Sequence, residues 1–180
     1  MLNRRSLLRA SALTFPAIAL AACTISTVNG VTTLTISVAQ VVAWGTAFDN
    51  VAKTVAGLPG IPAAVSASAT ALAITIASNL AAFHKAAGSN VNLTFDRTSV
   101  PAVINSLLAD GKTLLADLQG VLTGVAQADA AMVQEYINAI STLVSVFEAA
   151  LGSVAAKVAI KAGTVPMTEG AALLVCGVTY

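Results

Sequence analysis

Charged residues are scarce in this chain, and the residues that build catalytic centres are scarcer still. Of its 180 residues, 9% are charged and 4% are aromatic, and the chain has one histidine and two cysteines. Soluble domains usually carry about 25% charged residues. No Walker loop, Gly-x-Gly-x-x-Gly or Gly-x-Ser-x-Gly motif occurs, and no Glu-x-x-His pair of the di-iron type. The sequence therefore predicts a protein that is not an enzyme and that uses no metal or cofactor.

The few titratable residues have plain structural interpretations. A catalytic zinc normally draws on several His or Cys ligands, whereas His84 is the only histidine. His84-Lys85 is expected at the end of a helix, where positive charge meets the negative end of the helix dipole. Cys176 could pair with His84 as a nucleophile, but nothing in the sequence orients the pair, so a buried thiol is preferred. Asp110 and Asp117 are expected to be solvated surface charges.

The clearest pattern lies in the first 22 residues. Arg4, Arg5 and Arg9 form a basic start, residues 10–22 are uncharged and mostly apolar, and Cys23 follows. A basic region, an apolar stretch and small residues before a cut are the parts of a secretory signal. The apolar stretch is shorter than the about 20 residues that span a bilayer. Residues 1–22 are therefore predicted to be a signal peptide that is removed.

Two resemblances refine this prediction. Arg4-Arg5 followed by Ser-Leu-Leu-Arg resembles the twin-arginine export signal, with Asn3 and Leu7 as departures from its usual pattern, and general secretory export stays an alternative. Leu20-Ala21-Ala22-Cys23 resembles the lipobox of bacterial lipoproteins. The second resemblance implies that the chain is cut before Cys23 and that its sulfur is diacylated. The alternative is an ordinary cysteine beside a simple Ala-x-Ala cleavage site.

The lipobox resemblance also implies a location and a partner. It places the protein in the bacterial cell envelope, facing the periplasm and bound to the membrane through lipidated Cys23. Thr24 follows where an aspartate would signal retention in the inner membrane of enteric bacteria, which slightly favours the outer membrane. From Cys23 onward the formal charge is −2 and no basic cluster occurs, so nucleic acid is not an expected partner. The expected partner is an envelope protein or a second copy of the chain.

Hydrophobic periodicity predicts an all-α, up-and-down four-helix bundle with a short extended N-terminal segment. Glycine and proline near residues 57–62, 88 and 124 mark the breaks between periodic segments. Similar helix lengths and two short connections favour alternating directions. The helices are expected at about 37–57, 62–87, 100–123 and 129–157.

The segments around the bundle are predicted separately. Asn29-Gly30 between β-branched runs indicates a β-hairpin over residues 23–36, with a flexible lipid-anchor tether as the alternative. Val91, Leu93 and Phe95 alternate with polar residues, which predicts a short strand beside this segment. The bundle is expected to occupy residues 37–160. Residues 161–180 are expected to form an apolar tail, as a short helix or strand packed on the bundle.

Two features bear on contacts with other molecules. No charged residue occurs from Ile61 to Phe83, a length that can span a bilayer, but the abundance of Ala, Ser and Thr favours a central, tightly packed helix of the bundle. Trp44 lies off the apolar stripe of its helix. It is a candidate interaction residue at a protein interface or the membrane surface, or else an edge-of-core residue.

Two functional hypotheses follow. The first is an exported, membrane-anchored lipoprotein with a non-enzymatic structural or protein-interaction role in the bacterial cell envelope. The alternative is a membrane-active helical protein, of the pore-forming, immunity or exclusion type, that inserts the Ala-rich hairpin 37–87 into lipid.

Overall fold

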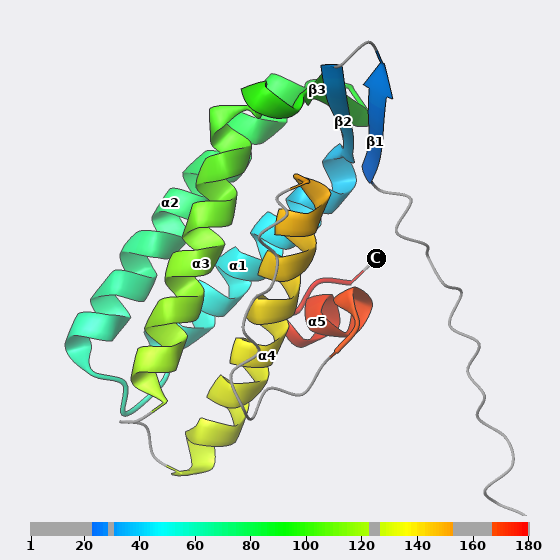
Figure 1. Ribbon diagram of the computed structural model, residues 1–180. Coiled ribbons are helices and arrows are strands. Elements are labelled where there is room, and N and C mark those ends of the chain that lie inside the picture. Colours follow the sequence, from blue (N-terminus) through cyan, green and yellow to red (C-terminus); the bar gives the residue numbers. More distant parts are fainter. Residues whose placement is uncertain (1–22, 29–30, 123–126, 153–166, 180) are drawn as a thin grey trace, which may run out of the picture.

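Helices and a small sheet make up the described part of the chain. The structure, a computed structural model, describes residues 23–28, 31–122, 127–152 and 167–179. Within these ranges it has five α-helices, a 3-10 turn and one three-stranded antiparallel sheet (Figure 1). The described fold is therefore mostly helical, as predicted, but it is not all-α, because it also contains the sheet. The expected signal peptide, with Arg4 and Arg5, lies outside the described residues.

The four long helices lie close to the predicted ranges. The third begins after Pro101, and the fourth ends at Ala150 rather than at 157. Gly152 follows with a φ of +66°, and its carbonyl accepts a hydrogen bond from Arg97 Nη2. A left-handed glycine is a common way to end a helix, which explains the earlier stop. The helices are α1 Val38–Gly57, α2 Ala63–Ala87, α3 Ala102–Val121, α4 Gln127–Ala150 and the short α5 Glu169–Val175.

The sheet joins the amino-terminal segment to the middle of the chain. Strands β1 (Cys23–Val28), β2 (Val31–Ser37) and β3 (Asn92–Asp96) pair in that order, all antiparallel. This agrees with the hairpin alternative, and with the strand expected at residues 91–95. Leu34 and Ile36 are buried on one face of β2, while Thr33 and Thr35 are only partly buried. Alternation with period two therefore turns one face of the sheet toward the helices.

The sheet also fixes the directions of the helices. Strand β2 runs directly into α1, where Val38 donates its amide to the Val91 carbonyl at 2.9 Å. Strand β3 connects α2 to α3, and Arg97 reaches Gly152 just beyond α4. One end of each long helix therefore lies at the sheet, and successive helices alternate in direction.

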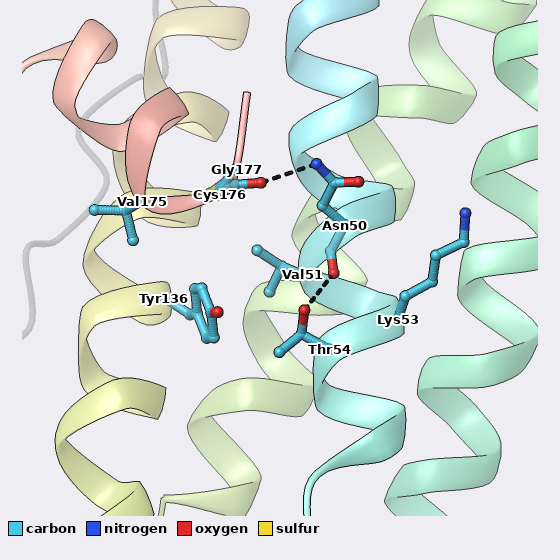
Figure 2. Close-up of a pocket in the computed structure, with 8 residues that line it drawn as sticks. All are labelled: Asn50, Val51, Lys53, Thr54, Tyr136, Val175, Cys176 and Gly177. Carbon is cyan, nitrogen blue, oxygen red and sulfur yellow. Dashed lines mark hydrogen bonds between the residues drawn. The ribbon is translucent and has the colours of Figure 1, made fainter. Parts of the chain in front are cut away.

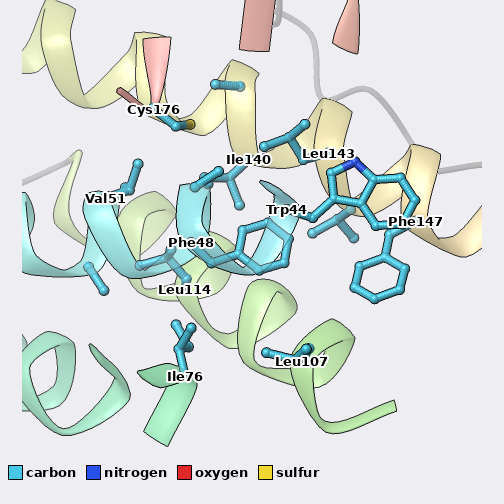
Figure 3. Close-up of a cluster of buried hydrophobic side chains, with 14 of the residues drawn as sticks. Trp44, Phe48, Val51, Ile76, Leu107, Leu114, Ile140, Leu143, Phe147 and Cys176 are labelled. Atoms are coloured by element: carbon cyan, nitrogen blue, oxygen red, sulfur yellow. The ribbon is translucent and has the colours of Figure 1, made fainter. Parts of the chain in front are cut away.

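Helix α1, not α2, is the centre of the molecule. It packs against α2, α3, α4 and α5, and large side chains such as Trp44 and Phe48 are completely buried on it (Figure 3). The prediction that residues 62–87 form the central helix is wrong. The small side chains of α2 fill little space, so this helix buries one narrow stripe: Ala69, Leu72, Ala73, Ile76, Phe83 and Ala87.

Aromatic rings fill the middle of the core. The rings of Trp44 on α1 and Phe147 on α4 lie 4.5 Å apart between centroids, tilted by 38°. Phe48 packs against Gly111 on α3, where the missing side chain leaves room for its ring. Figure 3 shows these rings among aliphatic side chains from α2, α3 and α4.

The end of the chain belongs to the same core. Helix α5 lies against α4 and α1 and buries Ala172, Leu173 and Cys176 (Figure 1). Thr168 caps its first turn by accepting the Ala171 amide at 3.3 Å. The apolar tail thus ends in a short helix.

Candidate functional site

The predicted lipidation residue opens the first strand. Cys23 is the first residue of β1 and pairs with Ile36, the penultimate residue of β2. Val38, where α1 begins, is two residues beyond Ile36. Cys23 therefore sits at the end of β1 nearer the helices, and no flexible segment separates it from the folded domain.

Aliphatic side chains on the hairpin are open to solvent. Ile25, Val28 and Val31 are 55%, 63% and 50% exposed. The chain has no charged residue between Arg9 and Asp49. Threonine hydroxyls make cross-strand hydrogen bonds here, for example between Thr27 and Thr32 at 3.1 Å. The hairpin next to Cys23 is thus an uncharged and partly apolar surface.

Trp44 does not lie on the surface. Its side chain is fully buried, and its Nε1 donates to Glu169 Oε1 at 2.7 Å. Gln40 Nε2 donates to the same oxygen at 2.8 Å. Trp44 is therefore a core residue that fastens α5 to α1, not an exposed interaction anchor. The sequence did not reveal this because Glu169 lies 125 residues further along the chain.

The two residues considered for nucleophilic chemistry are not placed for it. Cys176 is 2% exposed, and burial raises the pKa of its thiol to about 12. His84 is exposed in the last turn of α2. A thiol with such a pKa stays protonated at neutral pH and is a poor nucleophile. Within the described residues, no group of three or more His, Cys, Asp or Glu side chains could hold a metal ion.

Asp110 and Asp117 link two helices. Asn79 Nδ2 on α2 donates to Asp110 Oδ2 at 2.7 Å, and Ser68 Oγ donates to Asp117 Oδ2 at 2.8 Å. Burial raises the pKa of Asp110, partly offset by the hydrogen bond from Asn79. Both carboxylates are partly exposed, and each also links α3 to α2, a role that the expectation of solvated surface charges did not include.

An open cavity lies between α1, α4 and α5. Its volume is about 360 Å³, and Val51 and Cys176 are among the apolar residues that line it (Figure 2). Asn50 Nδ2 donates to the Cys176 carbonyl at 3.0 Å, which holds the end of α5 over the cavity. Lys53 Nζ is held by Asp49 Oδ2 at 2.6 Å. No sequence motif marks this cavity, since its walls come from three separate elements. The lining residues are Asn50, Val51, Lys53, Thr54, Tyr136, Val175, Cys176 and Gly177.

Helix α2 presents a broad uncharged face. Only 22% of its most apolar 18-residue window is buried, and Ile74 near its middle is 68% exposed. By length and composition, this is the one helix in the described ranges that could cross a membrane. Most of the residues on the exposed face are Ala, Ser and Thr.

Known proteins offer no guide to these features. No protein-family model, curated protein or solved structure matches the chain. Its function therefore has to be inferred from its own residues.

Proposed function

We propose that the protein is a lipoprotein of the bacterial cell envelope, anchored through Cys23, with a non-enzymatic structural or protein-interaction role. The observation that carries the proposal is that the candidate lipidation residue is itself part of the folded domain. Leu20-Ala21-Ala22-Cys23 resembles a lipobox, and Cys23 is paired with Ile36 in the β1–β2 hairpin. Cleavage before Cys23 would leave the whole described fold intact.

The position of Cys23 gives the anchor a geometric consequence. A lipid on this residue would attach to the sheet without a linker, at the end of β1 nearer the helices, so the junction between the sheet and the helices would be held close to the bilayer. The four long helices, taken as an up-and-down bundle, would extend away from that junction. The exposed face of α2 and the open cavity between α1, α4 and α5 remain open to a partner.

The placement of the titratable side chains supports a binding role. The buried Cys176 thiol stays protonated, and His84 is exposed in the last turn of α2. Asp110 and Asp117 serve as hydrogen-bond acceptors between helices. The described surface exposes charged side chains such as Lys85 and Glu135 together with hydroxyls, amides and aliphatic groups, a mixture that suits an interaction surface.

The membrane-active alternative has one observation in its favour, the exposed and uncharged face of α2. Insertion of the whole hairpin 37–87 would also move α1, however. That step would remove Trp44 and Phe48 from the core and take the Asp49–Lys53 ion pair into lipid. Both changes are costly, because buried aromatic residues dominate core energetics and charges in a bilayer are expensive.

Replacement of the anchor residue tests the proposal. Cys23→Ser protein should be found in the soluble fraction with an intact helical spectrum, whereas wild type should stay with the membranes. Cys176→Ala is the matched control, because it removes the other cysteine and should leave the protein on the membrane. Mass spectrometry should find an acylated Cys23 at the mature amino terminus.

Two results would contradict the proposal. Cys23→Ser protein that resists an alkaline wash would favour insertion by the helices. An unmodified Cys23 with residues 1–22 still attached would rule out the lipid anchor itself.

A further inference from the structure

The cross-strand register creates a row of apolar residues that stops at the edge of the sheet. Phe95 on β3 is opposite Leu34 on β2, and Leu34 is opposite Ile25 on β1. Residues directly opposite each other share a face of the sheet. Leu34 is 1% exposed, Phe95 is half-buried, and Ile25 is 55% exposed. The row therefore runs from a buried centre to an open end.

The open end is also an unpaired strand edge. Strand order places β1 at one side of the sheet, and no described strand pairs with its outer edge. Proteins commonly protect such edges with charged residues, proline or a bulge. The segment Cys23–Val28 contains no charged residue and no proline, and it is rich in β-branched residues. The opposite edge strand, β3, is five residues long and ends in Asp96. Only the β1 edge thus lacks a charge.

The unpaired backbone indicates which occupant fits. Free N–H and C=O groups along β1 are costly in the hydrocarbon of a bilayer, because nothing there can bond to them. A second strand satisfies these groups and covers the aliphatic side chains at the same time. Figure 1 shows β1 on the side of the sheet away from α2 and α3, so these helices do not cover it.

We propose that two copies of the protein pair through antiparallel β1 strands, with Ile25 of one copy opposite Ile25 of the other. The six-stranded sheet would then carry one continuous apolar row, Phe95–Leu34–Ile25 in each copy, meeting at the two-fold axis. Thr24 would face Ser26 of the second copy, which keeps polar residues together on the other face. The inference rests on the proposed function, since cleavage before Cys23 leaves no residues ahead of the strand. Two anchored copies also share one membrane, which raises their effective concentration.

Cross-linking in native membranes tests the pairing. An Ile25→Cys variant should form dimers with a short bifunctional maleimide, because the two introduced thiols face each other. Val28→Cys is the matched control: Val28 is more exposed, at 63%, but it lies beyond the paired segment. It should stay monomeric. Equal cross-linking of both variants, no dimer from Ile25→Cys, or cross-links to a different protein would overturn the proposal. The unmutated protein should not cross-link, because any free Cys23 thiols would lie about 14 Å apart at opposite ends of the paired strands, and dimers of it would overturn the proposed register. Mass spectrometry of Cys23 separately reports whether the lipid anchor is present.

Charge reversal gives a second, independent test. Two copies with different tags should co-purify when both are wild type. Ile25→Lys with itself and Ile25→Glu with itself should not co-purify, because like charges directly opposite repel. A mixture of Ile25→Lys and Ile25→Glu should restore the pair. Each variant should keep the wild-type circular dichroism spectrum, since Ile25 is already half exposed. Co-purification of two lysine variants, or no recovery in the mixture of folded variants, would rule the pairing out.

Discussion

At the scale of single residues, the carboxylate of Glu169 joins the end of the chain to its centre. Its Oε1 accepts from Trp44 Nε1 and from Gln40 Nε2. Removing it in Glu169→Ala leaves the buried indole N–H without a partner, which should cost about 1–3 kcal/mol of unfolding free energy. Trp44 is the only tryptophan, so its fluorescence during urea denaturation reports the change. Glu169→Gln keeps an acceptor oxygen and should lose less. Unchanged stability of Glu169→Ala would mean that this contact does not hold α5.

The thiol of Cys176 should be chemically silent in the native protein. Burial raises its pKa to about 12, so almost no thiolate exists at pH 8. We expect Cys23→Ser protein, in which Cys176 is the only cysteine, to react with a thiol reagent at pH 8 only after guanidinium is added. Rapid reaction of one thiol per chain without denaturant would show that α5 opens readily.

Two carboxylates should give pH dependences of opposite sign. Burial raises the pKa of Asp110, so the native state binds this proton more tightly than the unfolded state, and stability falls as pH rises through the range just above 3.8. Hydrogen bonds from the Thr98 amide and hydroxyl lower the pKa of Asp96, so its contribution is present above 3.8 and is lost as pH falls through the native pKa. The stability of Asp110→Asn minus that of wild type should therefore be larger at pH 7 than at pH 3. Asp96→Asn should be less stable at pH 7, with the difference vanishing in acid. Thermal unfolding at pH 3, 5 and 7 measures both, and shifts of the same sign would contradict the assignment.

At the scale of elements, two glycines on α3 should respond in opposite ways to alanine. A Cβ on Gly111 would lie 2.6 Å from Phe48 Cε2, too close to be accommodated without moving a fully buried ring. Gly111→Ala should therefore cost about 1–3 kcal/mol. Gly120 has nothing within 4 Å of the added atom, and Gly120→Ala should gain about 0.5–1 kcal/mol from helix propensity. Urea denaturation measures both. If Gly111→Ala were as stable as wild type, the close packing of α1 on α3 would be disproved.

The elements themselves were predictable because their signals are local. Seven-residue and three-to-four-residue spacing of apolar side chains predicted the long helices, and Asn29-Gly30 between β-branched runs predicted the hairpin. Their relative positions were not predictable in the same way. Periodicity shows which face of a helix is apolar, but not how many neighbours surround it. This is why α2 was expected at the centre and α1 occupies it.

The candidate sites also differ in whether their signal lies within one segment or depends on distant segments. Cys23 could be proposed as a lipidation residue from a contiguous pattern, since the resemblance needs only the residues just before it. The burial of Trp44, the Asp110–Asn79 link and the cavity beside Tyr136 depend on residues far apart in the sequence. No spacing within one segment predicts such contacts. They become visible only when the helices are assembled.

At the scale of the whole molecule, the two ends of the bundle should differ in their relation to lipid. Cys23 and the sheet lie at one end, together with Ala87, where α2 ends. Ile74 lies roughly 20 Å along α2 from that end, at 1.5 Å per residue. The proposed anchor at Cys23 would therefore leave the exposed middle of α2 about this far from the point of lipid attachment.

A lysine in the middle of α2 distinguishes the anchor from insertion of the helix. Lysine at the centre of a spanning helix costs about 3 kcal/mol, whereas on an exposed face it costs little. Because Ile74 is 68% exposed, we expect Cys23→Ser protein and its Ile74→Lys derivative to be equally stable and equally unable to bind vesicles or release a trapped dye. Ile74→Val keeps the apolar surface and should behave in the same way. If α2 inserts, Cys23→Ser protein will bind vesicles and Ile74→Lys will abolish that binding while Ile74→Val retains it. Flotation of the three proteins with vesicles therefore decides whether α2 faces water or lipid.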